Sequence, residues 1–333
     1  MRKLFVLGNG VDWCEISLSK LIKRENVYML NEKLPLVKNH KVARIHFSNK
    51  LNKHFDVPFK SIWFRSVKKY ILDNSDRNDE IVLLVFDWNV FGGEKQFVRY
   101  IRKKIKNIRI VYIFTNIVKG SYAIQKKYVE KLNEWYDVVF AFDPIDSEKY
   151  GFSYSPLIYD SDPAYDKEKD ESNEDMVFYV GQAKDRLNGL LSCYEKLRSL
   201  GIICDFHIAN VDEDALKYQD EIVYNKFITY SEAVDCIRKS TCLVDVVQGD
   251  SAGLTIKTCE AVCYDKKLLT TNKHVIEYPF YDSRFIRVVE SADDIDSDFF
   301  SLNRDVHYSE EGKRYFSADR FLERLENELI KNG

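Results

Sequence analysis

Residues 177–186, Val177-Phe-Tyr-Val-Gly181-Gln182-Ala-Lys184-Asp-Arg186, run from a short apolar segment through a glycine to two basic side chains. Val177–Val180 has the composition of a buried strand, and the stretch Asp185–Leu200 that follows is typical of an amphipathic helix. A glycine at the turn between them lets the backbone bend tightly and approach a ligand closely. This stretch therefore predicts the opening strand and helix of a parallel α/β sheet.

The same alternation of apolar runs and amphipathic stretches extends in both directions along the chain. Because continuous apolar strands separated by helices indicate a parallel sheet covered on both faces, the pattern favours a doubly wound fold. Further strands are predicted at Leu4–Leu7, Val42–Ile45, Ile81–Phe86, Ile108–Phe114, Val138–Phe142, Cys204–Ile208, Ile222–Tyr224, Cys242–Val247, Lys267–Leu269 and Phe285–Val289. Further helices are predicted at Glu94–Ile105, Tyr122–Trp135, Ser231–Lys239 with Ser231 as N-cap, Thr255–Tyr264 and Ala318–Lys331.

A polar, strongly acidic stretch interrupts the alternation from Asp160 to Asp175. It contains almost no aliphatic residues, which is typical of a linker or an exposed loop. We expect an N-terminal domain at 1–160, an acidic linker at 161–175, a C-terminal domain at 176–315, and a helix at 316–333 that could cross back to the N-terminal domain. The predicted fold class is α/β, with two Rossmann-like doubly wound domains facing a cleft.

The charge of the chain is unevenly distributed. The formal net charge is −3, which gives no indication of nucleic-acid binding, and we expect no nucleic-acid partner. The first 150 residues are nevertheless rich in Lys and Arg, which could face an anionic substrate or an anionic membrane surface; a solvated helix face is the simpler interpretation. Examples are Arg99, Arg102, Lys103, Lys104 and Lys106.

Neither the cysteines nor the histidines form a metal-type cluster. The seven cysteines lack zinc spacing and mostly lie in apolar runs, which favours reduced thiols in a cytosolic protein. No Asp-x-Asp motif stands where a metal would hold a diphosphate, so we expect neither a metal nor another cofactor. Since no run of about 18 apolar residues occurs, any contact with the inner face of a membrane is expected to be peripheral.

Polar groups gather where strands of the C-terminal domain end. Lys184 and Arg186 would place positive charge at the mouth of the sheet, where a diphosphate could sit. The loop before the helix at Thr255 leads to a helix N-terminus, which suits a phosphate. The simpler interpretation is a turn with solvated basic residues, caps at Ser251 and Thr255, and Glu260 on a helix surface. The candidate ligand-contacting residues are Gly181, Gln182, Lys184, Arg186, Ser251, Gly253, Leu254, Thr255 and Glu260.

The order of these elements is more informative than any one motif. A strand ending in Gly181-Gln182, a Gly253-Leu254-Thr255 loop entering a helix with Glu260-Ala261, and then the run Lys266-Lys-Leu-Leu-Thr-Thr-Asn272 resemble the C-terminal donor domain of GT-B-fold glycosyltransferases. More narrowly, this region resembles bacterial enzymes of capsular or lipopolysaccharide biosynthesis, most clearly across Val177–Tyr281. The resemblance implies a nucleotide-diphosphate sugar donor, with a UDP-sugar favoured.

The resemblance also implies roles for individual residues. Gly253, Leu254 and Thr255 would lie near the diphosphate, and Glu260 would bind the ribose. Enzymes of this fold generally work without a bound metal. Many retaining members carry two glutamates separated by seven residues, but Ala252 occupies the matching position here, so the stereochemistry of transfer stays open.

Two segments of the N-terminal domain could contribute acids or acceptor contacts. Gly8-Asn9-Gly10 follows the first strand without the third glycine of a dinucleotide site, and in GT-B enzymes this loop usually faces the acceptor. Asp12 is a candidate general base there, or else a helix N-cap. Asp87 is a second candidate base, and Trp88 could stack on a sugar ring; Asp87 could equally shape a turn.

These features together predict a glycosyltransferase that moves a sugar from a nucleotide diphosphate to a hydroxyl of a surface glycan or lipid-linked glycan, such as capsule, O-antigen or lipopolysaccharide. The alternative is a non-catalytic nucleotide- or glycan-binding partner subunit of a glycosyltransferase. A sugar-nucleotide epimerase of related fold is a third interpretation, but the sequence shows no clear acid–base set for it.

Overall fold

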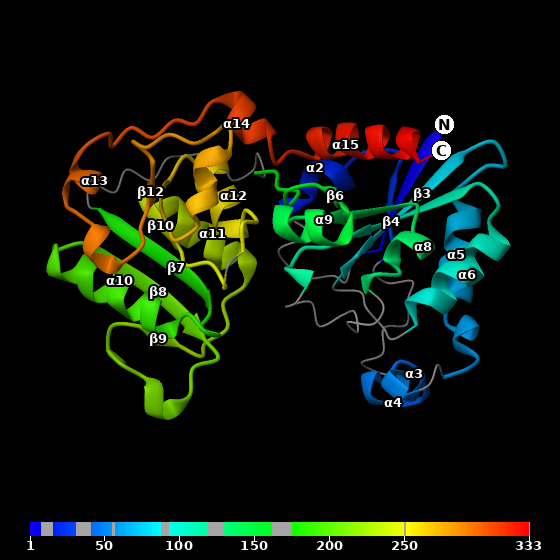
Figure 1. Cartoon of the computed structure of the whole chain (residues 1–333), viewed down its shortest axis with the longest axis horizontal. Coiled ribbons are helices and arrows are strands. Elements are labelled where there is room, and N and C mark those ends of the chain that lie inside the picture. Colours follow the sequence, from blue (N-terminus) through cyan, green and yellow to red (C-terminus); the bar gives the residue numbers. More distant parts are fainter. Residues whose placement is uncertain are drawn as a thin grey trace. The chain divides into compact units, whose positions relative to one another are not determined.

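The computed structural model describes residues 1–7, 16–30, 41–54, 57–87, 93–118, 129–161, 175–249 and 251–332. The chain forms two compact units, each made of more than one segment (Figure 1). Unit 1 comprises Met1–Glu15, Ser19–Pro156 and Phe321–Gly333, and unit 2 comprises Ile16–Leu18 and Leu157–Arg320.

Unit 1 is built on a six-stranded parallel sheet in the order β2-β1-β3-β4-β5-β6. Its central strands are continuous apolar runs, and residues such as Phe5, Leu83 and Tyr112 are fully buried between the sheet and its helices. The strands are β1 (Arg2–Leu7), β2 (Val27–Met29), β3 (Glu80–Phe86), β4 (Ile108–Ile113), β5 (Val138–Ala141) and β6 (Ser153–Tyr154).

Short helices and the longer helices α5, α6 and α15 accompany this sheet. α5 and α6 are amphipathic, burying Val67 and Ile71 on one and Phe97, Val98 and Ile101 on the other. The helical elements of unit 1 are α2 (Ser19–Ile22), α3 (Lys41–His46), α4 (Asn49–His54), η1 (Lys60–Ile62), α5 (Arg65–Asp73), α6 (Glu94–Lys104), α8 (Leu132–Trp135) and α9 (Pro144–Tyr150), with most of α15 (Ala318–Lys331).

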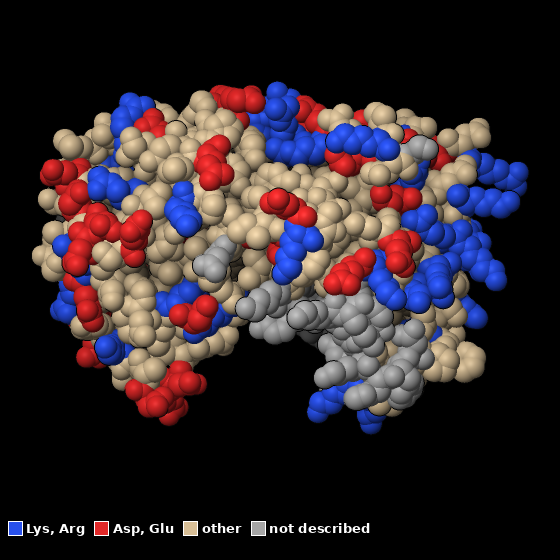
Figure 2. Space-filling view, viewed as in Figure 1, with Lys and Arg blue, Asp and Glu red and all other residues tan. Residues whose placement is uncertain are grey.

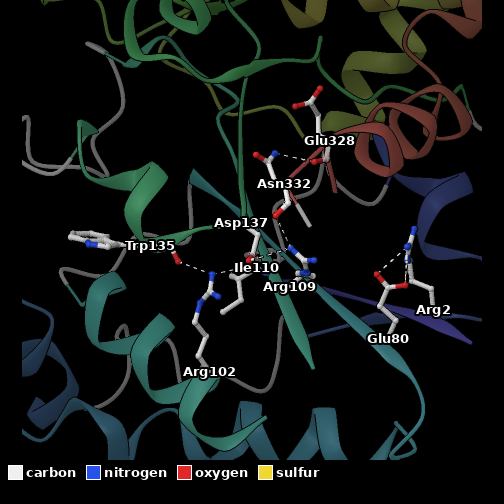
Figure 3. A network of polar contacts seen from close by, with 9 residues as sticks. All are labelled: Arg2, Glu80, Arg102, Arg109, Ile110, Trp135, Asp137, Glu328 and Asn332. Carbon is white, nitrogen blue, oxygen red and sulfur yellow. Dashed lines mark hydrogen bonds and ion pairs between the residues drawn. The ribbon is translucent and has the colours of Figure 1, made fainter. Parts of the chain in front are cut away.

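The C-terminal helix α15 is tied to the sheet of unit 1 by polar contacts at several strands. Arg2 on β1 pairs with Glu326, and Ser153 on β6 donates a 2.6 Å hydrogen bond to Glu328. Figure 3 shows Arg109 on β4 donating to the backbone oxygen of Asn332, beside the carboxylate of Asp137. These contacts make the last residues of the chain part of unit 1.

Unit 2 contains a second six-stranded parallel sheet, in the order β12-β11-β10-β7-β8-β9. This is the strand order of the doubly wound dinucleotide-binding fold. The strands are β7 (Met176–Gln182), β8 (Ile203–Ala209), β9 (Val223–Tyr224), β10 (Cys242–Asp245), β11 (Lys267–Thr270) and β12 (Ile286–Val288). The helices are α10 (Leu187–Ser199), η5 (Glu213–Ala215), α11 (Tyr230–Lys239), α12 (Ile256–Cys263), η6 (Lys273–Glu277), η7 (Ala292–Asp294), α13 (Asp298–Ser301) and α14 (Glu310–Arg314).

Two predicted elements are wrong in detail. Val42–Ile45 is not a strand: it lies in helix α3, where Ala43 is buried while Val42 and Ile45 are about half exposed, as one-sided burial on a helix requires. The N-cap of α11 is Thr229 rather than Ser231, because Thr229 and Glu232 form a reciprocal capping box.

The first residue of the acidic stretch also differs from the prediction of a linker or exposed loop. Asp160 is buried rather than part of an exposed loop: its carboxylate accepts a hydrogen bond from the Ala318 amide, and its own amide donates to Ser17. Residues 162–174 lie outside the described residues. Among the described helices, none is long and apolar enough to cross a membrane.

Candidate functional site

The strand order of unit 2 singles out one position on its sheet. β7 and β10 are neighbours, and the chain continues from β7 toward β8 and β9 on one side but from β10 toward β11 and β12 on the other. In open α/β sheets, ligands bind beyond the carboxyl ends of the two strands that flank such a reversal. The candidate site therefore lies at the loops that follow Gln182 and Asp245.

Position 181, near the end of β7, has room only for glycine because the Tyr179 side chain packs against it. A Cβ atom at position 181 would lie 2.8 Å from the Tyr179 hydroxyl, a distance too short for a real contact. That hydroxyl is buried and has no hydrogen-bond partner among the described residues. Because burial raises the pKa of Tyr179 to about 12, the phenol is a neutral donor beside Gly181.

Lys184 and Arg186 connect the loops after β7 and β10. Lys184 adopts a left-handed backbone conformation (φ 48°) and donates a 2.9 Å hydrogen bond to the Gln248 side chain. Arg186 donates to the backbone oxygens of Val246 at 2.8 Å and Gln182 at 2.6 Å. Burial and the charge of Arg186 lower the pKa of Lys184, as expected for two cations held close together. The two predicted cations therefore meet at the carboxyl ends of both strands.

The loop before α12 is fixed by two side chains. Thr255 is the N-cap of α12, its hydroxyl accepting from the amide of Lys257 at 3.1 Å. Asn272, buried after β11, donates to the backbone oxygen of Gly253 at 3.1 Å. Leu254 is fully buried and Ser251 is partly exposed. These contacts hold the N-terminal end of α12, whose partial positive charge suits an anion.

Asp245, the last residue of β10, is a further site residue that is not among the candidates predicted from the sequence. Its carboxylate is buried, with the hydroxyls of Thr258 and Thr270 each 3.3 Å from Oδ2. Burial raises its pKa, while a hydrogen bond to Thr255 and the charge of Arg186 oppose that shift. An acidic residue closing an apolar strand was the available signal.

Glu260 lies inside unit 2 rather than on a solvated helix surface. Its side chain is fully buried: Oε2 accepts from Lys257 Nζ at 2.6 Å and Oε1 from the Tyr230 hydroxyl at 2.8 Å. The Tyr159 and Tyr230 hydroxyls are 2.9 Å apart. This network joins α11, α12 and the segment around Tyr159, and both oxygens of Glu260 are engaged in it.

In unit 1, Asp87 directly follows β3, one of the two strands that flank the reversal in strand order between β2-β1 and β3-β4. Its side chain is buried and Oδ1 accepts a 2.6 Å hydrogen bond from the Thr115 hydroxyl. Burial raises the pKa of Asp87 to about 6, close to the range in which a carboxylate can accept and release protons near neutrality. The other candidates of this unit, Gly8, Asn9, Gly10, Asp12 and Trp88, lie outside the described residues.

Over the ranges that the structure describes, no group of His, Cys, Asp and Glu side chains could hold a metal ion. The arrangement instead offers positive charge from Lys184 and Arg186, the capped end of α12, and the neutral hydroxyl of Tyr179 as donors for an anionic ligand.

The sequence matches no protein-family profile and no curated protein. The fold matches an alpha-glucosyltransferase in complex with UDP-glucose and DNA containing an abasic site, with a TM-score of 0.57, 11% identity and coverage of 99% of both chains. Lower similarity is found to the glycotransferase of kitacinnamycin (TM-score 0.46, 10% identity, 98% of both chains) and to the glycosyltransferase SnogD from Streptomyces nogalater (TM-score 0.41, 12% identity, 99% of this chain and 95% of that chain). With its two parallel, doubly wound α/β units, the chain has the GT-B fold of glycosyltransferases.

Proposed function

We propose that this protein is a glycosyltransferase that moves a sugar from a nucleotide diphosphate to a hydroxyl of a surface glycan, without a metal ion. The observation that carries the proposal is the junction of Lys184 and Arg186 with the loops after β7 and β10, at the strand reversal of unit 2. Two cations at this position suit a diphosphate. UDP is the favoured nucleotide, and the similarity to a fold neighbour in complex with UDP-glucose supports that choice.

In the proposed reaction, the acceptor oxygen forms a bond to the anomeric carbon of the sugar while the bond from that carbon to the diphosphate oxygen breaks. The bonding electrons leave with the diphosphate, so negative charge grows there. Lys184, Arg186 and the N-terminal end of α12 would stabilise that charge. Gly181, Gln182, Gly253 and Leu254 would let the backbone approach the nucleotide, with Ser251 and Thr255 beside the phosphates.

The acceptor hydroxyl must lose its proton during an inverting transfer. Asp87 is the described carboxylate best suited to accept it, because its pKa of about 6 leaves it mostly ionised at neutral pH and a good proton acceptor. Asp12 is the second candidate for this step. Binding of the ribose by Glu260 requires one of its oxygens to exchange a present partner, Lys257 or Tyr230, for a ribose hydroxyl.

The test is a thermal-shift panel of UDP-, GDP- and CMP-sugars on the full chain, because a ligand that binds only the folded state raises the unfolding temperature. We expect UDP-sugars to stabilise the wild type and to stabilise Lys184→Gln less. Lys196→Gln on the neighbouring helix α10 is the matched control and should behave like the wild type.

No stabilisation by any nucleotide sugar would contradict the proposal. Stabilisation without donor consumption, unchanged in Asp87→Asn, would instead favour a non-catalytic nucleotide- or glycan-binding partner subunit. Transfer to DNA in place of a glycan would contradict the proposed acceptor.

A further inference from the structure

Positive charge is concentrated in the first part of the chain. The first 150 residues contain 28 Lys and Arg and 17 Asp and Glu, a net charge of +11, although the whole chain carries −3. On the surface of unit 1, Lys and Arg gather over α5 and α6, at the right-hand side of Figure 2. None of the candidate transfer residues lies on these two helices.

A hollow of about 650 Å³ lies between α5 and α6 and has four cations in its lining. These are Arg65, Lys68, Lys69 and Lys104, and among the described lining residues Asp73 is the one that is acidic. Within the part of the chain that the structure describes, none of the four cations has an ion-pair partner. Positive charge that is left unneutralised on one face is a feature of surfaces that bind polyanions.

An exposed aromatic ring in a strained backbone precedes, by two residues, Ser61 in the lining of this hollow. Phe59 is 77% exposed and has φ 63°, a left-handed conformation that bulky residues rarely adopt. The next residue, Lys60, is fully buried and donates a hydrogen bond to Asn52, which also accepts from the amide of Val57. This anchoring of Lys60 inside the unit leaves Phe59 directed to solvent.

Aliphatic side chains accompany the ring. Ile62, one residue after Ser61 in the lining, is 45% exposed, and so is Leu72 within the lining itself. A ring that is this exposed contributes little to the core. Residues held in a strained backbone conformation cluster at functional sites. We call Arg65, Lys68, Lys69 and Lys104, together with Phe59, Ile62 and Leu72, the basic-apolar surface.

We propose that the basic-apolar surface docks this protein on an anionic lipid bilayer. Cations near a negatively charged leaflet attract its phosphates, and exposed aromatic and aliphatic side chains enter the boundary between headgroups and acyl chains. A nucleic acid would use the cations and could stack a base on Phe59, but it offers no apolar phase for Ile62 and Leu72. The inference goes beyond sugar transfer and does not depend on it, since it concerns binding by residues outside the proposed transfer site.

The charge contribution is tested by co-sedimentation of the full chain with vesicles of phosphatidylcholine, with and without phosphatidylglycerol. We expect binding only to the anionic vesicles, with weaker binding at high salt. The triple variant Lys68→Gln, Lys69→Gln, Lys104→Gln should lower the affinity on the order of a hundredfold, since each basic residue contributes about fivefold. A matched triple in unit 2, Lys217→Gln, Lys226→Gln, Lys273→Gln, removes the same charge from exposed positions and should leave binding unchanged.

The apolar contribution is tested with two exposed phenylalanines. Phe59→Asn should weaken vesicle binding several-fold, whereas Phe227→Asn, at an 87% exposed position of unit 2, should leave it as in the wild type. These substitutions remove a ring from the surface and leave the core intact, so the unfolding transition of each variant verifies its fold.

Three results would overturn the inference. The first is equal binding to neutral and anionic vesicles, and the second is an equal loss in both lysine triples, which would show an effect of net charge alone. The third is tighter binding to an oligonucleotide than to anionic vesicles at the same salt, lost in the Lys68, Lys69, Lys104 triple, which would make the partner a nucleic acid. UDP-sugar stabilisation is measured on the same variants, so a failure of docking is distinguishable from a failure of the proposed transfer activity.

Discussion

The hydroxyl of Thr115 donates a 2.6 Å hydrogen bond to Oδ1 of Asp87, which joins the segments that follow β3 and β4 in unit 1. The bond favours the ionised carboxylate, while burial of Asp87 favours the neutral acid and has the larger effect, so that its pKa rises to about 6. This balance makes the protonation of Asp87 sensitive to both its partner and the pH.

If Asp87 accepts the acceptor proton, Asp87→Asn removes the proton acceptor but keeps an oxygen for Thr115. Transfer should fall roughly a hundred- to ten-thousandfold, the usual contribution of a general base. In the wild type, kcat/KM should rise with pH, reach half of its plateau near pH 6 and level off at higher pH, because the ionised form is the active one. The measurement is a pH profile of donor consumption with acceptor present.

Thr115→Val tests the same assignment, because it changes the pKa of Asp87 without removing its carboxylate. Since the Thr115 hydrogen bond lowers the pKa of Asp87, its removal should raise the pKa and move the rising limb to higher pH, with the plateau rate largely kept. An unchanged rate in Asp87→Asn, or a limb that stays in place in Thr115→Val, would exclude Asp87 as the base.

The buried pair of Lys257 and Glu260 should govern the stability of unit 2. Lys257→Met leaves the Glu260 carboxylate buried without its cation, which should lower the free energy of unfolding by about 3–5 kcal/mol. The double change Lys257→Met, Glu260→Met removes both charges and should recover most of that loss. Urea unfolding of the two variants checks this, and a double variant as unstable as the single one would show that the pair itself is not the cause.

Gly181 should be intolerant of even a methyl group. Gly181→Ala places Cβ 2.8 Å from the Tyr179 hydroxyl, which is buried and cannot move away freely, so UDP-sugar affinity should fall about tenfold or more as the β7 end shifts. Tyr179→Phe in the same chain removes the clashing oxygen and should restore part of the affinity. Gly189→Ala on α10 is the control, because its Cβ would make only an ordinary 3.6 Å contact with Val246. Calorimetric titration with a UDP-sugar measures these three variants and Tyr179→Phe alone, and additive effects of the two changes at 179 and 181 would refute the coupling.

Relief of backbone strain at Phe59 should stabilise the protein. Asn tolerates the left-handed region much better than Phe, so Phe59→Asn should raise the free energy of unfolding by about 1 kcal/mol. Phe227 has no such backbone conformation, and Phe227→Asn should leave stability within about 0.5 kcal/mol of the wild type. Chemical denaturation decides between these results, and a less stable Phe59→Asn variant would show that the ring contributes to the fold.

The parallel sheets were predictable from sequence because their central strands are continuous apolar runs. Ile81–Phe86 and Ile108–Phe114 were expected as strands, and β3 and β4 occupy almost the same residues. Val42–Ile45 is mostly apolar as well, although it contains Arg44, but four residues do not separate a strand from a helix by periodicity alone. β2 was missed because Val27–Met29 is a three-residue edge strand with partial exposure, which leaves almost no apolar pattern.

Only those parts of the site that are formed by residues close together in the sequence were predictable. Gly181, Lys184 and Arg186 follow a strand directly, so their place at the sheet edge followed from the chain order. The surroundings of Glu260 could not be predicted from the chain order. Tyr159 and Tyr230 come from segments about a hundred and about thirty residues away, and they surround Glu260 through tertiary contacts. Asp245 was not predicted because it ends the strand β10, whose other residues are apolar and indicate only a core position.

The most direct test of the central claim is to incubate the full chain with UDP-sugars and a panel of bacterial surface-glycan acceptors and to follow UDP and the glycan mass by mass spectrometry. The account predicts one UDP released for each sugar added to the glycan, with turnover strongly reduced in Lys184→Gln and Asp87→Asn but not in Lys196→Gln. Binding of a UDP-sugar with no UDP released under any condition, or release that is identical in all four proteins, would contradict it.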